Sequence, residues 1–278
     1  MHIKPLPERV EERIRAWNLT VESTSETPSS ILVFGKRVGL PVVLKVSRQP
    51  GDEWHSGAVL AAFEGKGIVR AAEFEAGAVL LERLQPATSL AAIALQGRDD
   101  EATEILADVM QRMSPRNEGR EAFVTVQEWG QGFARYLASD DPQIPRALVA
   151  QAQCAYTELC ASQQNVRLLH GDLQHYNVLL DNARGWTAID PKGVVGELEY
   201  EIGASLRNPC ERPELFTAST TITRRIKCYE ARLRLNAERA LRWSFAQAVL
   251  SAIWMVEDGG TVEAHPLQLA HSIRALLG

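Results

Sequence analysis

Cysteine is scarce in this sequence, and the thiols that are present form no framework. The 278 residues include four cysteines and no Cys-x-x-Cys pair. Thiols this few and this widely spaced exclude a disulfide-stapled scaffold and a cysteine zinc site. We therefore expect free thiols in a reducing compartment, at Cys154, Cys160, Cys210 and Cys228.

Long apolar runs are also missing. An apolar patch such as residues 248–256 is interrupted by Ser251 and is shorter than the roughly 18 residues that a membrane span requires. The first 15 residues are dotted with charges and lack the apolar core of a secretory signal. We expect a cytoplasmic protein that does not contact a membrane.

An excess of positive charge is absent as well. Lys and Arg total 30 against 35 Asp and Glu, a net charge of −5, which disfavours nucleic acid as a partner because such binding relies on basic surface. No repeat or long linker is present, and no obligate protein partner is evident. A hydrophobic content of 45% is typical of a globular protein, and the length suggests two modest domains.

Periodicity predicts an α+β arrangement in two unequal parts. Up to residue 84 we expect a helix at 7–17, hairpin strands at 31–34 and 41–47, a helix at 58–63 and a strand at 78–83. After residue 85 we expect helices at 101–113, 122–138, 146–161, 222–235, 240–257 and 266–277. A β-rich island at 168–189 interrupts them, with strands at 177–180 and 186–189.

That island contains the residues that point to chemistry. The run His-Gly-Asp-Leu-Gln-His-Tyr-Asn at 170–177 precedes Ile-Asp-Pro, and a hairpin can bring both acids and the amide together. Asn177 and Asp190 could supply oxygen ligands to Mg²⁺, and Asp172 could accept the proton of an attacking hydroxyl. Lys45, inside an apolar strand, could pair with the phosphates of ATP.

Each of these residues taken alone has an ordinary explanation. Lys45 could be a lysine on the solvent side of its strand. Asp172 and Asn177 could satisfy the backbone of a turn, and Asp190 before a proline could open one. The order and spacing of the four together favour a phosphoryl-transfer site.

These motifs resemble those of a known family. His-Gly-Asp-Leu-x-x-x-Asn followed by Ile-Asp-Pro is similar to the aminoglycoside phosphotransferases, small-molecule kinases with a protein-kinase-like fold. Residues 189–197 and the Arg-Asn-Pro at 207–209 resemble the branch of streptomycin 6-kinases and hydroxyurea phosphotransferases. The resemblance implies a small, β-rich, nucleotide-binding lobe at 1–84 and a larger, mostly helical, catalytic and substrate-binding lobe at 85–278.

The resemblance implies the same roles for the four residues and adds further contacts to ATP. An acidic helix residue should hold Lys45 in place. Glu53 is the best candidate, Glu64 is the runner-up, and an ordinary surface ion pair is the alternative. The adenine should bond to backbone groups after the last small-lobe strand, by analogy the Glu82 carbonyl and the Leu84 amide.

The sequence also departs from the protein-kinase pattern. A glycine-rich loop is missing before the lysine strand, where Ser-Glu-Thr-Pro-Ser-Ser stands at 25–30. Backbone amides and the hydroxyls of Ser29 and Ser30 would have to cover the phosphates. Gln174 stands where many relatives have histidine, which leaves its role open. His170 fits a structural hydrogen-bonding role better than that of a proton shuttle.

Three acids close to the proposed metal site suggest a cationic substrate. Glu197, Glu199 and Glu201 could bind the guanidinium groups of a streptomycin-like molecule, although in a helix only the first and last share a face. A solvated helix face is the alternative. Arg207 and Lys192 could neutralise acids or contact phosphate, and the sequence does not decide between these roles.

Together these features predict an ATP- and Mg²⁺-dependent phosphotransferase. It would transfer the γ-phosphate to a hydroxyl of an aminoglycoside-type antibiotic, in the manner of a streptomycin 6-kinase, and so confer resistance. A kinase of the same fold acting on hydroxyurea or a metabolite is the alternative. A non-catalytic nucleotide-binding protein is a third reading, which the intact set of four residues disfavours.

Overall fold

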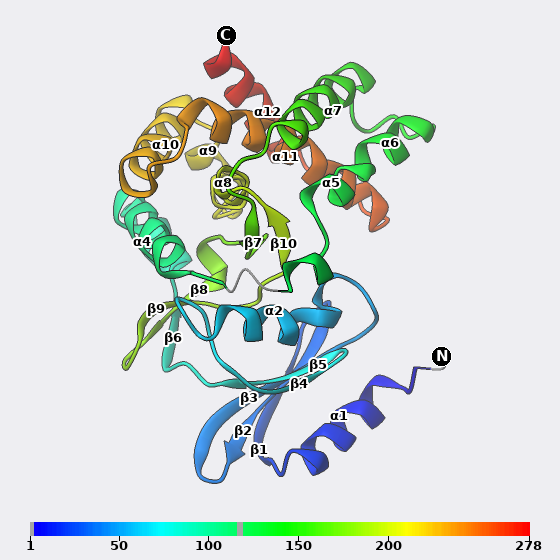
Figure 1. The fold of residues 1–278 in the computed structure, drawn as a ribbon, viewed down its shortest axis with the longest axis vertical. Coiled ribbons are helices and arrows are strands. Elements are labelled where there is room, and N and C mark those ends of the chain that lie inside the picture. The colour runs from blue at the N-terminus through cyan, green and yellow to red at the C-terminus, as the bar shows by residue number, and fades with distance from the viewer. Residues whose placement is uncertain (1–2, 116–118) are drawn as a thin grey trace.

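The N-terminal part of the chain folds around one antiparallel sheet (Figure 1). The computed structural model describes residues 3–115 and 119–278. The strands of this sheet lie in the order β1-β2-β3-β5-β4. The elements of this part are α1 (Leu6–Ala16), β1 (Thr20–Glu26), β2 (Ser30–Arg37), β3 (Leu40–Ser47), the 3₁₀ turn η1 (Asp52–His55), α2 (Ser56–Phe63), β4 (Ala71–Glu75) and β5 (Ala78–Glu82).

Alternation along β3 gives the two faces of the sheet different surroundings. Val42 and Leu44 are buried on one face, in a cluster that includes Val10 of α1. Val43 and Lys45 point to the opposite face because successive strand residues alternate, and both line the cavity described below. The N-terminal helix therefore covers one face and leaves the other to a ligand.

The rest of the chain is mostly helical, with two small antiparallel sheets, β6-β8-β9 and β10-β7. Its elements are β6 (Pro86–Ser89), α3 (Ala91–Leu95), α4 (Asp99–Arg112), η2 (Arg120–Ala122), α5 (Val126–Trp129), α6 (Gln131–Ala138), α7 (Arg146–Ala161), β7 (Arg167–Leu169), η3 (His175–Asn177), β8 (Val178–Asp181), β9 (Gly185–Ala188), β10 (Val194–Gly196), α8 (Leu198–Leu206), α9 (Pro213–Phe216), α10 (Ser219–Leu233), α11 (Ala237–Glu257) and α12 (Ala264–Leu277).

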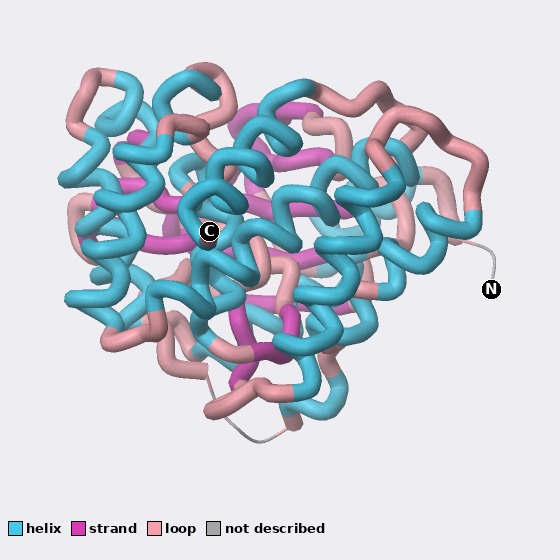
Figure 2. The backbone as a smooth tube through the Cα atoms, turned by 90° about the horizontal axis from the view of Figure 1, so that it is seen from above, coloured by secondary structure: helices cyan, strands magenta, loops and turns pink. Residues whose placement is uncertain are grey.

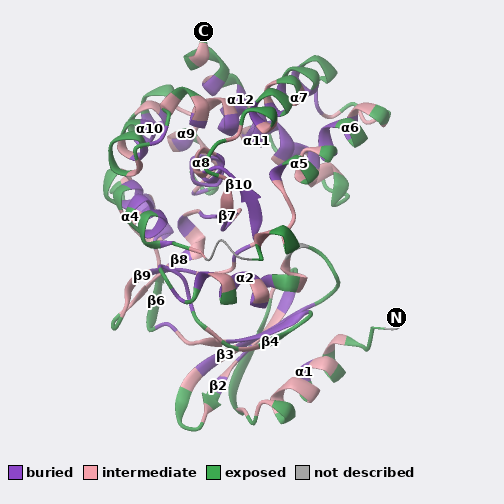
Figure 3. Ribbon diagram, viewed as in Figure 1, coloured by how far each residue is buried: buried purple, intermediate pink, exposed green. Residues whose placement is uncertain are grey.

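Helix α11 forms the centre of this larger part. It packs against α7, α8 and α12, and the view from above shows the helices crowded together (Figure 2). Trp243 of α11 is fully buried, and the rings of Tyr156 and Tyr200 meet it edge-on at centroid distances of 4.9 and 5.1 Å. Burial is concentrated in these inner segments, whereas β1 is exposed along its whole length (Figure 3).

The structure corrects two of the predicted elements. The single helix predicted at 122–138 begins only at Val126, because Thr125 and Glu128 form a capping box there. It is also divided at Gly130 into α5 and α6. The strand predicted at 177–180 begins one residue later, since Asn177 ends the 3₁₀ turn η3. The lobe boundary that we propose after residue 84 lies between β5 and β6, which belong to different sheets. Within the described ranges, no helix is both long and apolar enough to cross a bilayer.

Candidate active site

A cavity of about 500 Å³ lies between the five-stranded sheet and the segment after β9. The sheet lines it mainly with apolar side chains, together with Lys45, Ser30 and Glu82, and Asp190 lies on the opposite side. Apolar walls with a few convergent polar groups are typical of a small-molecule site. The apolar lining from the sheet consists of Leu32, Phe34, Val43, Val79 and Leu81.

The cavity brings together most of the residues predicted to contact ATP. Ser29, Ser30, Glu82 and Leu84 all line it. The carboxylate of Glu82 points elsewhere, since it accepts from the Arg70 amide at 2.8 Å and pairs with the Arg184 guanidinium. Glu82 can therefore offer only its backbone groups to an adenine.

The loop before β2 is tied together by its own polar side chains. Thr27 Oγ1 accepts from the Ser30 amide at 2.9 Å and lies 2.8 Å from the Ser30 hydroxyl. Ser30 is only 1% exposed. Its hydroxyl therefore already has a partner within the loop, which makes Ser29 the freer of the two predicted hydroxyls.

Lys45 lies between two carboxylates that come from opposite sides of the cavity. Its Nζ is 2.8 Å from Glu53 Oε2 and donates to Asp190 Oδ1. Glu53 therefore holds the lysine, whereas Glu64, the other candidate, pairs with Lys66. Glu53 sits in η1 rather than in the first turn of α2.

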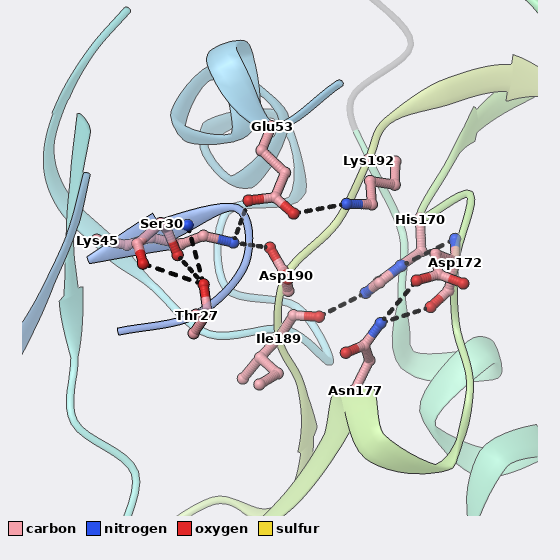
Figure 4. A network of polar contacts seen from close by, with 10 residues as sticks. All are labelled: Thr27, Ser30, Lys45, Glu53, His170, Asp172, Asn177, Ile189, Asp190 and Lys192. Atoms are coloured by element: carbon pink, nitrogen blue, oxygen red, sulfur yellow. Dashed lines mark hydrogen bonds and ion pairs between the residues drawn. The ribbon is translucent and has the colours of Figure 1, made fainter. Parts of the chain in front are cut away.

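A second lysine shares the same glutamate. Lys192 Nζ donates to Glu53 Oε1 at 2.7 Å (Figure 4). Burial would raise the pKa of Glu53, but the charges of Lys45 and Lys192 outweigh it and lower this pKa to about 2. Glu53 is therefore ionised at neutral pH, and it links the small lobe to the segment after Asp190.

Asp172 and Asn177 are bonded to each other across their loop. Asn177 Nδ2 donates to the Asp172 carbonyl at 2.9 Å and to its Oδ2 at 3.1 Å. The Ile189 amide donates to the Asn177 carbonyl at 2.9 Å, which places Asp190 beside this pair. Burial raises the pKa of Asp172, while the charges of Arg207 and Lys192 oppose that shift.

His170 connects the two segments of the site. Its Nδ1 accepts from the Asp172 amide at 3.3 Å, so its Nε2 carries the proton and donates to the Ile189 carbonyl at 2.8 Å. The ring is fully buried, and burial lowers its pKa to about 4. A neutral imidazole with both nitrogens bonded has a structural role, which agrees with the interpretation from the sequence.

The structure contradicts the prediction that Glu201 faces a substrate. Its side chain is buried, and its carboxylate accepts from the amides of His170 at 2.7 Å, Gly171 at 3.1 Å and Leu173 at 3.3 Å. These amides flank Asp172. Glu201 therefore fixes the backbone of the loop that carries Asp172. The sequence carries no side-chain signal for this contact.

Glu197 is also turned inward, so its predicted contact with a substrate is wrong as well. It is buried, and its Oε1 accepts from the Arg239 guanidinium and the Trp243 indole. Glu199 is partly exposed and accepts from the Asn236 amide at 3.1 Å, where α11 begins. Glu197 and Glu199 make their contacts where α8 packs against α11, whereas Glu201 contacts the loop that carries Asp172.

The buried carboxylate of Glu201 leads to a first testable prediction. Burial raises its pKa to about 7 against the pull of three amides. The folded state thus holds a proton that the unfolded state releases near pH 4.5, and stability falls as pH rises between about 4.5 and 7. The free energy of unfolding is measured in urea for both proteins. Between pH 4.5 and pH 8, the free energy of unfolding of Glu201→Gln should rise by about 2–3 kcal/mol relative to that of wild type. Parallel pH curves for the two proteins would contradict this assignment.

Comparison with known proteins places this site in a family. The model of the aminoglycoside/hydroxyurea antibiotic resistance kinases matches residues 16–259. The chain belongs to this family. It is therefore an enzyme that transfers a phosphoryl group, as its motifs predicted.

Members with assigned activities align over most of the chain. A streptomycin 3''-kinase from Klebsiella pneumoniae is 36% identical over 249 residues, which cover 87% of this chain and 91% of the relative. A streptomycin 6-kinase from Streptomyces griseus is 29% identical, covering 96% and 88%. A hydroxyurea phosphotransferase from Kitasatospora aureofaciens is 28% identical, covering 92% and 75%.

Solved structures confirm the predicted protein-kinase-like fold of this family member. A choline kinase from Streptococcus pneumoniae superposes with a TM-score of 0.67 at 15% identity, covering 98% of both chains. An aminoglycoside phosphotransferase, APH(4)-Ia, solved with ADP and hygromycin B, gives 0.65 at 16% identity, covering 96% of this chain and 98% of that one. At these identities the likeness concerns the fold alone.

Proposed function

We propose that this enzyme transfers the γ-phosphate of ATP to a hydroxyl of streptomycin and thereby inactivates the antibiotic in the cytoplasm. The observation that carries the proposal is that two bonded pairs lie on neighbouring segments beside one cavity. Lys45 and Asp190 form one pair and line the cavity. Asp172 and Asn177 form the other, and the Asn177 carbonyl accepts from the Ile189 amide next to Asp190. Phosphoryl transfer requires a cation on the phosphates and a carboxylate that orients the attacking hydroxyl.

The residues are assigned to steps as follows. Lys45, held by Glu53, binds the phosphates, and the amides of the loop with Ser29 and Ser30 cover them. Asp172 orients the acceptor hydroxyl and takes its proton as the bond to phosphorus forms. Arg207, whose positive charge acts on this carboxylate, favours its ionised form.

The adenine is assigned to the part of the cavity that is lined by Glu82 and Leu84. It would rest against the apolar lining and bond to the Glu82 carbonyl and the Leu84 amide. The position of the segment after β5 at the cavity supports this assignment.

Mg²⁺ is the metal that the reaction implies, and the side chains present fit it. The side-chain nitrogen of Asn177 donates to Asp172, which leaves the side-chain oxygen of Asn177 available as a metal ligand. Asp190 gives Oδ1 to Lys45, and among the described residues its Oδ2 has no partner. Carboxylate and amide oxygens suit Mg²⁺, so Asn177 and Asp190 would hold it. When bound, the ion neutralises charge on the phosphates.

The relatives favour one hydroxyl of streptomycin over the other. The 3''-kinase is 36% identical to this chain, whereas the two 6-kinases are 26% and 29% identical. We therefore propose the 3''-hydroxyl as the acceptor, in place of the 6-hydroxyl that the sequence motifs suggested. Hydroxyurea is the second candidate, because a hydroxyurea phosphotransferase aligns over 92% of the chain.

A screen of ADP release tests the proposal. The purified enzyme with MgATP should release ADP faster upon addition of streptomycin than without an acceptor. If hydroxyurea stimulates ADP release and streptomycin does not, hydroxyurea becomes the assigned acceptor. An Asp172→Asn sample in parallel shows how much ADP comes from contaminating enzymes.

A further inference from the structure

Lys192 is a partly buried cation beside the loop that carries Asp172, and the roles above leave it without a function. It follows Asp190 by two residues, and its amide donates to the His170 carbonyl at 2.9 Å. A Cβ built on Gly171 would lie 3.5 Å from Lys192 Cβ. The side chain therefore starts directly above the loop that carries Asp172 and extends toward the small lobe (Figure 4).

The ammonium of Lys192 stands among three carboxylates. It donates to Glu53 at 2.7 Å, and its side chain is 24% exposed. The charges of Asp190, Glu53 and Asp172 all act on this ammonium. It therefore lies at a point from which it acts on both the proposed metal ligand and the proposed base.

Holding Glu53 does not require a second lysine. The buried carboxylate already has a cation of opposite charge, because Lys45 lies 2.8 Å from Oε2. Lys192 has three N–H donors, and among the described residues Glu53 is its only side-chain acceptor. Two donors are therefore free to turn toward the space between Asp190 and Asp172, where the transferring phosphoryl group must pass.

We propose that Lys192 is a further catalytic residue, whose ammonium leaves Glu53 and donates to the oxygens of the γ-phosphoryl group as it transfers. The inference rests on the phosphoryl-transfer activity and not on the identity of the acceptor. The bond from phosphorus to the bridging oxygen of ADP breaks, and the bond to the acceptor oxygen forms. The hydroxyl proton goes to Asp172, and Lys192 gives up no proton.

Glu53 makes this movement possible. While Lys192 is on the phosphoryl group, Glu53 keeps Lys45 as its partner, so no buried carboxylate is left unpaired. A cation aimed at charge that develops in the transition state contributes about 10²- to 10³-fold to kcat. Lys192 should therefore act on kcat far more than on the affinity for ATP.

The test is a double-mutant cycle between Lys192 and Glu53. Lys192→Met should lower kcat by about 10²-fold or more and change the Kd of MgATP by less than about fivefold. The same fall in kcat should occur when Lys192→Met is added to the Glu53→Gln protein. Lys192→Arg, which keeps the positive charge, should have a higher kcat than Lys192→Met. Lys36→Ala, which removes a surface lysine paired with Glu22, is the matched control.

Two results would overturn the proposal. One is an unchanged kcat in a folded Lys192→Met protein. The other is a loss that disappears in the Glu53→Gln background, since Lys192 would then act only by holding Glu53. ATP hydrolysis without acceptor is measured in all variants. A slower hydrolysis in Lys192→Met would support the role of Lys192 even if streptomycin is not phosphorylated.

Discussion

Replacing Asp172 with asparagine should lower kcat by roughly 10²- to 10⁴-fold, the range expected when a general base is lost. The Kd of MgATP should stay within a few fold of wild type, because Asn177 keeps its bond to the backbone carbonyl of residue 172 when the side chain is replaced. Stopped assays of phosphorylated acceptor give kcat, and calorimetry with a non-hydrolysable ATP analogue gives the affinity.

The pH dependence of the same pair of proteins sharpens this prediction. A base must be ionised, and burial raises the pKa of Asp172 above the usual 3.8. The rate of wild type should therefore fall on the acidic side at a pH above that of an ordinary aspartate, and this limb should vanish in Asp172→Asn. Asp140→Asn, on an exposed loop, should match wild type. An Asp172→Asn enzyme with wild-type kcat would remove Asp172 from the mechanism.

Replacing Asp190 with alanine should abolish the gain in ATP affinity that Mg²⁺ provides. The change removes a proposed metal ligand and one of the two carboxylates that Lys45 contacts. Losing the carboxylate partner of a cation across a binding interface costs about 2–5 kcal/mol, which corresponds to about 30-fold or more in the Kd of MgATP. Calorimetry of ATP with Mg²⁺ and with EDTA measures both values.

The conservative variant separates the two roles of Asp190. Asp190→Asn keeps an oxygen donor but loses the charge, so its affinity for MgATP should lie between those of wild type and Asp190→Ala. Equal affinity with Mg²⁺ and with EDTA is the expected signature of the alanine variant. A wild-type response of that variant to Mg²⁺ would show that other groups hold the metal.

The sequence predicts well those parts of the site that lie on short segments with a strict pattern. The period of two along β3 places Lys45 on the face opposite to that of Leu44 and Val46. Asp172 lies next to Asn177 because a single loop connects them over five residues. The helix at 7–17 follows from the spacing of Val10 and Ile14, which face the sheet. In these cases local geometry alone decides where a side chain points.

Other parts depend on partners that are distant in the sequence. Glu201 accepts from amides 28 to 31 residues earlier, and no side-chain type marks such amides in advance. Helix periodicity places Glu197 and Glu201 on one face but does not say that this face is covered. The break before α5 did carry a signal, because Thr125 and Glu128 have the spacing of a capping box.

The strands without an apolar stripe could not be found from periodicity. β1 is polar and exposed along its length, since it lies at the edge of the sheet, where it pairs with β2. The role of Lys192 was open for a different reason. Its partner, Glu53, lies 139 residues away, so the pair exists only once the two lobes are placed against each other.

The most direct test of the account is the structure of the product made from streptomycin. Phosphorus and proton NMR of the antibiotic after incubation with enzyme and MgATP should show one phosphate monoester, at the 3''-oxygen. The product should be missing when Asp172→Asn replaces wild type at the same concentration. Unmodified streptomycin after prolonged incubation with a folded, ATP-binding wild-type enzyme would contradict the proposed function.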